Sequence, residues 1–372
     1  MNILLLFGGK SCEHDISILT AKITEPPLKK VGKVFCVYVD PQNKWWLIEK
    51  DLQLNQYKTS YKKMGKRAFV VFGDNILRVF KGARIKEIAK IDVAVPCFHG
   101  VNGEDGSISG VLQLAGIPYT CGNPLACGVS MDKVASKAFF KGIGVSVLPF
   151  VVFNSIDDYK ALKAIKKLGY PLVVKPSTLG SSIGIKLANN LDELRAALNI
   201  AFCFDTKVIV EKALTDFYEV NCSAMRVKGI VETGDLERPV AKDKILTFAD
   251  KYASTGKESS ERIFPYEFEG KNKIKEITKR IYETFGFEGV IRVDFLVCSQ
   301  TKKIFVNEVN SIPGSLAFYL WQNRFTHQEF LREMIEQAIV AKKRTDTLVY
   351  AYQSDILQNK SPSKGLKILT NK

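Results

Sequence analysis

The sequence predicts an α/β protein whose N-terminal part is an open parallel sheet. Two observations lead to this class: apolar, strand-like runs recur at 2–7, 33–39 and 91–95, and a helical stretch at 17–28 separates the first two. Strand–helix–strand order is typical of parallel sheets, in which ligands bind beyond the carboxyl ends of the strands. The length of 372 residues predicts two or three domains, since one domain takes roughly 100–200 residues.

The N-terminal segment departs from a simple strand–helix repeat in two places. Its helix is expected to begin at Ser17 as a cap and to be limited by Pro26 and Pro27. Residues 41–90 have the composition of a β-rich insertion, with strands at 44–48 and 68–72. We therefore expect the insertion to add strands to the first domain.

The rest of the chain alternates helices with strands and ends in a strand-rich region. We expect helices at 123–141 and 190–201, and strands at 145–153, 171–175 and 207–211. Beyond these we expect a polar loop at 233–260, helices at 271–285 and 330–342, and paired strands at 289–298 and 303–309. Residues from about 346 onward are expected to form a loosely held tail.

Composition and terminal sequence limit the compartment. The chain is 46% hydrophobic and 25% charged, with a mean hydropathy of −0.02, which excludes a disordered or fibrous protein. No apolar run approaches the ~18–20 residues of a membrane span. Residues 1–8 lack the basic flank of a secretory signal. We expect a cytoplasmic protein with no membrane partner.

The formal net charge of +15 fits nucleic acid, an anionic membrane or a nucleotide phosphate as a partner. The basic residues are spread along the chain, however, and no aromatic residues are interleaved with their small clusters. A single-stranded nucleic-acid site requires such a stacking platform. The pattern therefore favours solvated basic surfaces, and we expect no nucleic-acid partner.

Cysteine and histidine usage excludes two further classes. The eight cysteines include no Cys-x-x-Cys pair, and none of the three histidines has the spacing of a zinc ligand. Several cysteines, such as Cys36 and Cys97, lie in apolar segments, where a buried free thiol is the usual state. The chain is predicted to be neither a disulfide scaffold nor a zinc protein.

The first candidate site follows the first strand. Residues 8–11, Gly-Gly-Lys-Ser, look like the end of a phosphate-binding P-loop, but that motif needs a glycine where this chain has Leu4. Glu13 comes directly after this turn, near a helix start. Taken by itself, Glu13 is most simply interpreted as a capping or buried glutamate.

The second candidate is the loop that follows Lys175. Small residues dominate it, among them Gly180, Ser181 and Ser182. A flexible loop of this kind can fold over a polyphosphate, with amides and hydroxyls donating to its oxygens while Lys175 neutralises charge. A plain Gly/Ser turn explains the loop equally well, so the residues alone leave both possibilities open.

The third candidate is the most specific. Arg292 and Asp294 alternate in one strand, and Glu308 and Asn310 in the next, so each pair shares a face. Two carboxylates and an amide that converge from paired strands suit Mg²⁺, which binds nucleotide phosphates. The alternative is an Arg–Asp ion pair on a sheet surface. Several polar residues in otherwise apolar strands are costly unless they are used, which favours the functional interpretation.

A weaker signal lies at the end of the strand at 207–211. A strand edge followed by the charged pair Glu211 and Lys212 can bind an adenine. A solvated strand end is the simpler interpretation of that pair by itself.

Together these segments resemble the D-alanine–D-alanine ligase family of ATP-grasp enzymes. Three more segments carry the resemblance: 98–106 (Phe-His-Gly-Val-Asn-Gly-Glu-Asp-Gly), 117–119 (Ile-Pro-Tyr) and 130–133 (Ser-Met-Asp-Lys), the last followed by Lys137. The ordered motifs run from residue 2 to about 340 and fail only over the insertion and the tail.

The resemblance implies a three-domain ATP-grasp fold. Its parts would be an N-terminal α/β domain at 1–121 that carries the insertion at 41–90, a central subdomain at 122–211, and a catalytic domain at 212–345 with a lid loop at 233–260, followed by a tail at 346–372. The implied activity joins two D-alanines through an acyl phosphate for peptidoglycan precursors. It would use ATP and two Mg²⁺ or Mn²⁺ ions, in a homodimer.

The resemblance also implies roles for single residues. The ATP-binding residues would be Lys133, Lys175, Ser182, Glu211, Lys212, Leu214, Glu219 and Lys251. The metal ligands would be Asp294, Glu308 and Asn310. Catalytic roles would fall to Glu13, Ser181, Tyr252, Arg292 and the backbone N–H of Gly314, and substrate contacts to Glu13, His99, Tyr319 and Leu320. The lid would exclude water from the acyl phosphate.

The chain departs from the family pattern at one position. Tyr319 stands where family members have a serine that holds the carboxylate of the second D-alanine. A phenol can still donate to a carboxylate, but D-serine or another amino acid is an alternative second substrate. Tyr252, where relatives that use D-lactate have a histidine, makes D-lactate a weaker alternative. A nucleotide-binding relative without catalysis is the remaining one.

Overall fold

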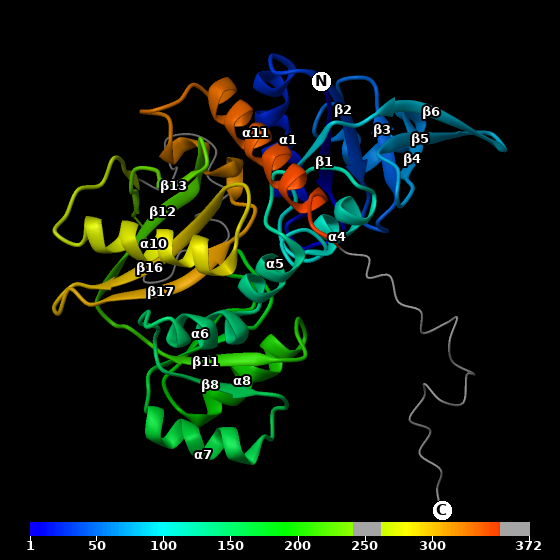
Figure 1. The fold of residues 1–372 in the computed structure, drawn as a ribbon. Helices are drawn as coiled ribbons and strands as arrows, with labels where there is room; N and C mark the ends of the chain where they lie inside the picture. Colours follow the sequence, from blue (N-terminus) through cyan, green and yellow to red (C-terminus); the bar gives the residue numbers. More distant parts are fainter. Residues whose placement is uncertain (241–261, 350–372) are drawn as a thin grey trace, which may run out of the picture.

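The computed structural model describes residues 1–240 and 262–349, which form three units (Figure 1). The N-terminal unit contains a sheet with the strand order β6-β5-β4-β3-β2-β1-β7. Strands β1 (Asn2–Gly8), β2 (Lys33–Val39) and β7 (Val93–Pro96) pair in parallel, as predicted. The insertion continues the same sheet with antiparallel strands β3 (Trp45–Ile48), β4 (Gly65–Val70), β5 (Ile76–Lys81) and β6 (Arg84–Lys90). The expected open parallel sheet is therefore a mixed one.

Helix α1 (His14–Lys29) starts earlier and ends later than expected. Ser17 is not its cap, because its hydroxyl accepts from the N–H of Gly8 and donates to the carbonyl of Cys97, both at 2.7 Å. Pro26 and Pro27 lie inside the last turns without ending the helix, although each removes a backbone donor from it. Ser17 thus ties α1 to the sheet.

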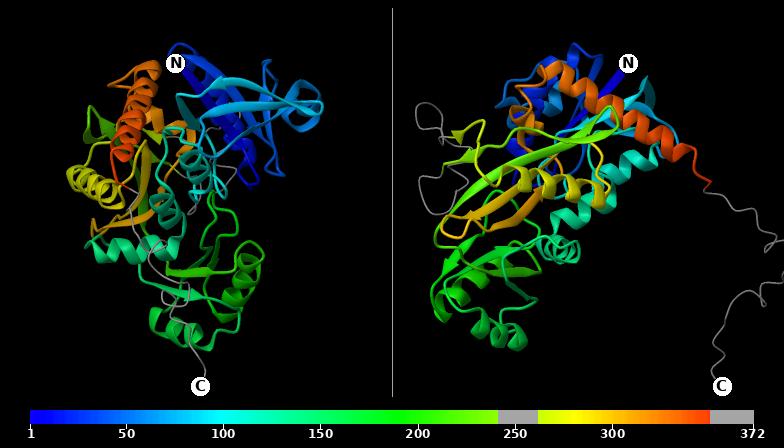
Figure 2. Two further views of the ribbon diagram at one scale, coloured as in Figure 1. Left: turned by 45° about the vertical axis from the view of Figure 1, so that its right-hand side comes forward. Right: turned by 60° about the vertical axis from the view of Figure 1, so that its left-hand side comes forward.

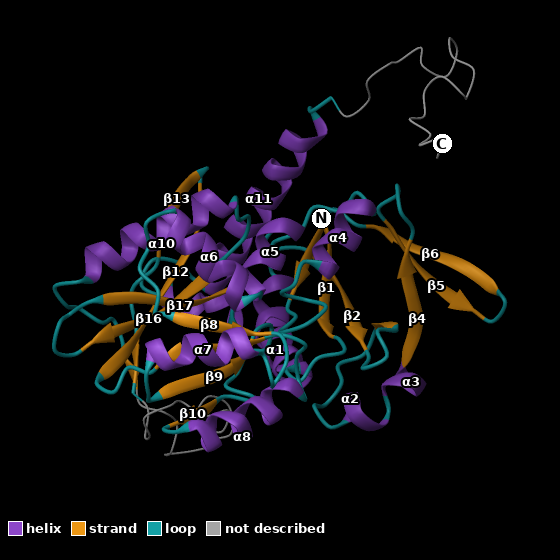
Figure 3. Ribbon diagram, turned by 90° about the horizontal axis from the view of Figure 1, so that it is seen from below, coloured by secondary structure: helices purple, strands orange, loops and turns teal. Residues whose placement is uncertain are grey.

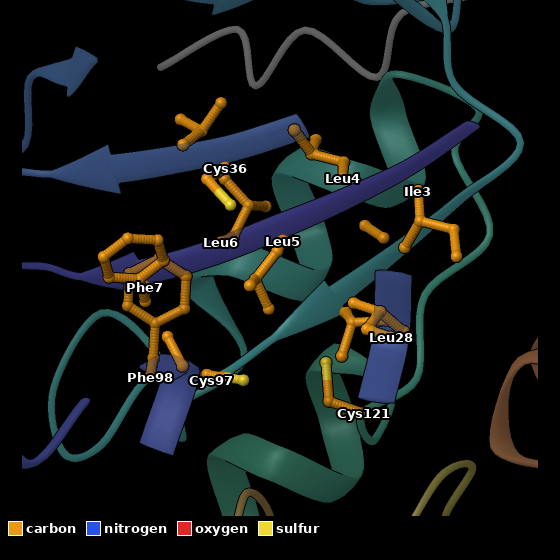
Figure 4. Close-up of a cluster of buried hydrophobic side chains, with 14 of the residues drawn as sticks. Ile3, Leu4, Leu5, Leu6, Phe7, Leu28, Cys36, Cys97, Phe98 and Cys121 are labelled. Carbon is orange, nitrogen blue, oxygen red and sulfur yellow. The ribbon is translucent and has the colours of Figure 1, made fainter. Parts of the chain in front are cut away.

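The core of the N-terminal unit forms where α1 and helix α4 (Ser107–Leu114) cover the sheet. Residues 3–6 of β1 have no exposed surface, and they pack with Leu28, Cys97 and Phe98 (Figure 4). The insertion also contains two one-turn helices, α2 (Gln56–Thr59) and α3 (Tyr61–Met64). Its strands β4, β5 and β6 project on the side of the molecule opposite to β16 and β17 (Figure 3).

The central unit is a four-stranded antiparallel sheet with the order β10-β9-β11-β8. Its elements are α5 (Pro124–Met131), α6 (Lys133–Gly142), β8 (Phe150–Phe153), α7 (Tyr159–Leu168), β9 (Leu172–Pro176), β10 (Lys186–Ala188), α8 (Leu191–Phe202) and β11 (Val208–Lys212). The single helix expected at 123–141 is two helices, because Asp132 leaves the helical conformation and caps α6 through the N–H groups of Val134 and Ala135.

The strand expected at 145–153 is confirmed only over its last four residues. Residues 145–148 leave the sheet of the central unit, and the carbonyl of Ser146 accepts from the N–H of Val306 in the next unit at 2.9 Å. Val145, Val147 and Leu148 are buried in this crossing. The segment therefore connects two units instead of extending β8.

The C-terminal unit is a second four-stranded antiparallel sheet, with the order β13-β12-β16-β17. Its strands are β12 (Phe217–Val227), β13 (Ile230–Thr233), β16 (Ile291–Cys298) and β17 (Ile304–Asn310), and a short ribbon pairs β14 (Arg238–Pro239) with β15 (Arg262–Ile263). Helix α10 (Lys271–Phe285) has the predicted bounds, and the predicted pairing of the last two strands is confirmed. A 3-10 helix, η1 (Gly314–Leu320), precedes α11 (His327–Asp346).

Helix α11 joins the C-terminal unit to the N-terminal one. It packs against α1 and β7 as well as against β12, and its course across the N-terminal unit is visible in Figure 2. Most of the predicted lid loop and of the predicted tail lies outside the described residues, so both stay predictions, as do the domain boundaries at 121/122 and 211/212. All eight cysteines are free thiols, as expected. Within the described ranges, no helix is long and apolar enough to cross a membrane.

Candidate active site

A deep cavity lies between the sheet of the central unit and that of the C-terminal unit. Strands β9 and β11 supply Lys175 and Glu211 on one wall, and β16 and β17 supply Asp294 and Glu308 on the other. Apolar side chains also line the cavity, namely Leu148, Val173, Ile185, Leu187, Leu214, Phe217 and Leu296. Lys212, Ser182 and Glu219 also line it. The cavity thus combines apolar walls with lysine and carboxylate side chains.

A second cavity adjoins the first on the side of the N-terminal unit. Glu13, His99, Arg292, Gly314 and Tyr319 line it. The two cavities share six lining residues, which are Lys133, Leu179, Gly180, Glu219, Asp294 and Glu308. A group bound in one cavity therefore meets a group bound in the other at the carboxylates of β16 and β17.

These carboxylates are brought together by strand register. Arg292 pairs with Asn310, and Asp294 pairs with Glu308, so all four predicted side chains share one face. The Arg292 guanidinium donates to both oxygens of Asp294, at 2.6 and 2.7 Å, and the Asn310 amide donates to Asp294 at 3.1 Å. Burial by itself lowers the pKa of Arg292, but Asp294 raises it well above its usual value, so Arg292 stays charged.

The chemistry of this donor set fits a divalent cation. Asp294, Glu308 and Asn310 offer two carboxylates and an amide oxygen on adjacent strands. Among the described residues, no cluster of three or more His, Cys, Asp or Glu side chains could hold a metal by itself. Mg²⁺ is commonly bound by one or two carboxylates and completes its shell with water and substrate phosphates. The residues present therefore suit an ion that arrives with a nucleotide.

Two buried lysines, Lys133 and Lys175, line the first cavity. Lys133 Nζ donates to the carbonyl of Leu179 at 2.7 Å and lies 3.5 Å from Glu308 Oε2. Lys175 Nζ donates to Glu211 Oε2 at 2.6 Å and to Asn307 Oδ1 at 3.2 Å. Both lysines are buried, and both lie within reach of an anion in the cavity.

The Glu211 carboxylate lies between two lysines, Lys137 and Lys175. Its second oxygen, Oε1, is 2.7 Å from Nζ of Lys137, a side chain with no exposed surface. Burial by itself raises the pKa of Glu211, but the charges of Lys137 and Lys175 lower it to about 2. Lys212 Nζ is held by the carbonyls of Gly169 and Tyr170, at 3.2 and 2.6 Å. Sequence reasoning missed the part played by Lys137, although it is in a segment that carries the family resemblance.

Glu13 and Ser181 meet across the N-terminal and central units. The hydroxyl of Ser181 donates to Glu13 Oε1, and both side chains are buried. Glycines leave little room on both sides of this pair: a Cβ on Gly180 would lie 3.0 Å from Glu13 Oε2, and one on Gly100, where φ of +74° favours glycine, would lie 2.9 Å from it. The backbone thus closes tightly around the Glu13 carboxylate.

His99 is buried and lines the same cavity as Glu13. Its Nε2 lies 2.8 Å from Thr20 Oγ1, which also accepts from the backbone N–H of Ser315 at 3.3 Å. Burial lowers the pKa of His99 to about 4, and the charge of Arg292 acts in the same direction. His99 is therefore neutral near pH 7, and its Nε2 can accept a hydrogen bond from the Thr20 hydroxyl.

Glu104 is a second residue to which sequence reasoning gave no role. It accepts from the N–H of Gly100 at 3.0 Å and from that of Ile312 at 3.3 Å, and it lines the second cavity. Burial, with a smaller contribution from the charge of Glu13, raises the pKa of Glu104 to about 8. The signal that could have found it is its position within the segment 98–106.

The far wall of the second cavity carries the departure from the family pattern. Tyr319 lines it together with Glu237 and Arg262, and the Arg262 guanidinium lies 5.3 Å from the centre of the Tyr319 ring. Burial raises the pKa of Tyr319, so the phenol keeps its proton. Leu320 is fully buried in the hydrophobic core and lines neither cavity. The expected contributions of Lys251 and Tyr252 lie outside the described residues.

Two antiparallel sheets that enclose a cavity with lysines on one wall and carboxylates on the other define an ATP-grasp fold. Family models support a narrower assignment: the model described as D-ala D-ala ligase N-terminus matches residues 2–122, and the model described as D-ala D-ala ligase C-terminus matches residues 139–337.

Individual relatives agree with this. The D-alanine–D-alanine ligase of Thermosipho africanus is 37% identical over 370 residues, which cover 97% of this chain and 99% of the relative. Among solved structures, D-alanyl-alanine synthetase A from Vibrio cholerae has a TM-score of 0.77 at 25% identity, covering 92% of this chain and 99% of that one. The VanG D-Ala:D-Ser ligase from Enterococcus faecalis has a TM-score of 0.76 at 26% identity, covering 91% and 99%. The chain belongs to the D-alanine–D-alanine ligase family, and it is an enzyme.

Proposed function

We propose that this enzyme uses ATP to join two D-alanines into D-alanyl-D-alanine for peptidoglycan precursors. One observation carries the proposal beyond the family assignment. The cavity suited to a nucleotide and the cavity suited to a small zwitterion adjoin at Lys133, Asp294 and Glu308. A phosphoryl group can pass between bound molecules only where the two sites meet in this way.

In this proposal the nucleotide occupies the first cavity. Its base lies at the apolar end beside Leu214 and the end of β11, where Glu211 and Lys212 are expected to contribute through that strand end, and Glu219 holds the ribose. Its phosphates face Lys133, Lys175 and the loop that contains Ser182. Lys251 is expected to join them from outside the described residues.

Asp294, Glu308 and Asn310 would hold two Mg²⁺ or Mn²⁺ ions together with the phosphates. When bound, the ions supply neutralisation of the charge that develops on the transferred phosphoryl group. The lysines on the opposite wall act on the same charge.

The first D-alanine would lie in the second cavity. Glu13 receives its ammonium group, Ser181 fixes Glu13, and the neutral His99 lies near the substrate carboxylate. A carboxylate oxygen attacks the γ-phosphorus and ADP leaves, so that an acyl phosphate forms. The amine of the second D-alanine then attacks the acyl carbon. Arg292 and the N–H of Gly314 would stabilise the tetrahedral oxyanion before phosphate leaves. Tyr252 is expected to belong to the Glu13–Ser181 network.

D-serine is the second candidate for the nucleophile. Tyr319 replaces the serine expected there, and it lies beside two polar side chains, Glu237 and Arg262. The VanG relative is named as a D-Ala:D-Ser ligase. Incubation of the enzyme with Mg²⁺, ATP and equal D-alanine and D-serine, followed by mass analysis, separates the candidates. We expect D-Ala-D-Ala to predominate. A predominance of D-Ala-D-Ser would show that D-serine is the preferred second substrate.

We further propose a homodimer that acts in the cytoplasm, in line with the family resemblance. Light scattering of the purified chain tests the first part. A mass near twice the chain's 41.6 kDa is expected, and a monomer at micromolar concentration would contradict it.

A further inference from the structure

We propose that Lys137 is a positioning residue that keeps Lys175 available to the ATP phosphates by neutralising Glu211. The inference rests on the proposed function only in placing ATP in the first cavity. Lys137 itself does not line either cavity and cannot touch the substrates.

Lys137 and Glu211 form a buried ion pair. Lys137 has no exposed surface and Glu211 is 1% exposed, so neither charge is solvated by water. A lysine is almost never fully buried unless it is paired, and burial of an unpaired ammonium is costly. The partner of Lys137 is Glu211 Oε1 at 2.7 Å. Such a pair is a weak source of stability compared with apolar packing, which raises the question of what else it provides.

The geometry of Glu211 gives the answer. Its two oxygens are divided between two lysines, Oε1 with Lys137 and Oε2 with Lys175 at 2.6 Å. Of the two lysines, only Lys175 lines the nucleotide cavity. The formal charges of the three groups sum to +1, and the excess lies on the side of Lys175. Without Lys137 the sum is zero, and Lys175 would be the only one of the two lysines left to neutralise the Glu211 carboxylate.

The size of the effect follows from Coulomb's law. For a separation on the order of 10 Å between two unit charges, and an effective dielectric of about 20, Coulomb's law gives a change in affinity of about tenfold. The Lys137→Met enzyme is therefore expected to bind ATP about tenfold more weakly. Its kcat at saturating ATP should stay close to that of the wild type, because the reacting atoms keep their neighbours.

The test measures binding of Mg²⁺-ATP by calorimetry without D-alanine. Lys141→Met is the matched control, since Lys141 is an exposed lysine one turn further along α6. It should leave ATP affinity within about twofold, because surface charges are screened. The decisive variant is the double change Lys137→Met with Glu211→Gln, which restores the formal charge sum to +1 on Lys175.

The charge account predicts that the double variant regains ATP affinity to within about threefold of the wild type. Wild-type affinity in Lys137→Met, or no recovery in the double variant, would overturn it. If Lys137→Met does not fold, the comparison is made in the Glu211→Gln background, where removal of Lys137 takes the formal charge sum from +2 to +1 and should again weaken ATP binding. Equal ATP affinity of Glu211→Gln and the double variant would then overturn the account. A wild-type enzyme that binds ATP but forms no dipeptide would refute the proposed function and leave this inference standing.

Discussion

Replacing His99 by glutamine is expected to remove part of the enzyme's sensitivity to acid. His99 is 5% exposed, and its Nε2 lies 2.8 Å from Thr20 Oγ1, within hydrogen-bond distance. Its pKa lies at about 4, compared with an ordinary value of 6.5. Because the pKa is lower in the folded protein, His99 is protonated in the unfolded chain but neutral in the folded protein between about pH 4 and pH 6.5. Stability is therefore retained above about pH 6.5 and is lost as the pH falls toward 4.

The magnitude follows from this difference. Near pH 5 the unfolded histidine is protonated and the folded one is neutral, which costs about 1.4 kcal/mol for each pH unit below the unfolded pKa. The folded wild-type enzyme should thus lose about 2 kcal/mol of stability between pH 7 and pH 5 through His99 alone. Glutamine does not titrate and can still hydrogen-bond Thr20, so His99→Gln should be spared this loss.

Urea unfolding of both proteins near pH 7 and near pH 5 measures the difference. Contributions of other groups, such as Glu104 with its raised pKa and His327 with its lowered pKa, are common to both proteins and cancel. The wild type should lose about 2 kcal/mol more than His99→Gln. Equal losses in the two proteins would refute the claim that His99 is held neutral by its buried site.

Three further predictions concern the reaction. Asp294→Asn and Glu308→Gln should each lower turnover at least about 100-fold. Asp294→Asn should also lower thermal melting, because the Arg292 guanidinium loses its carboxylate partner, so Glu308→Gln is the cleaner test; unchanged turnover would refute the metal assignment. Chelation of divalent ions should stop phosphate release, and added Mg²⁺ or Mn²⁺ should restore it; release that persists without them would contradict the proposed cations. Ser181→Ala removes the donor to Glu13 and should lower kcat/KM for D-alanine by about tenfold or more with ATP affinity unchanged; an equal loss of ATP affinity would show instead that the loop acts on the nucleotide.

The parts of the fold that sequence reasoning found are those controlled by local periodicity. Helix α10 has the predicted bounds because its apolar positions recur at helical spacing along 15 residues without a break. The shared face of Arg292, Asp294, Glu308 and Asn310 follows from strand alternation and pairing alone. These residues also carry the most specific part of the candidate site.

The parts that it missed depend on contacts between distant segments. Ser17 does not cap α1 because its hydroxyl donates a hydrogen bond to the backbone carbonyl of Cys97, 80 residues away. The role of Lys137 appears only when β11 places Glu211 over α6, and Glu104 becomes part of the site only when the N–H of Ile312 reaches it across 208 residues. No local pattern encodes these approaches. In the sequence alone, a side chain whose role depends on a distant partner cannot be distinguished from an ordinary helix or loop residue.

The most direct test of the account follows an oxygen atom. D-alanine labelled with ¹⁸O in its carboxylate is incubated with the enzyme, ATP and Mg²⁺, and both products are analysed by mass. If the carboxylate attacks the γ-phosphoryl group and the second amine displaces phosphate, each dipeptide formed must be accompanied by one phosphate that carries one labelled oxygen. Dipeptide with unlabelled phosphate would contradict the acyl-phosphate route, and labelled D-alanine left unconsumed while ATP remains bound would contradict the assigned substrate.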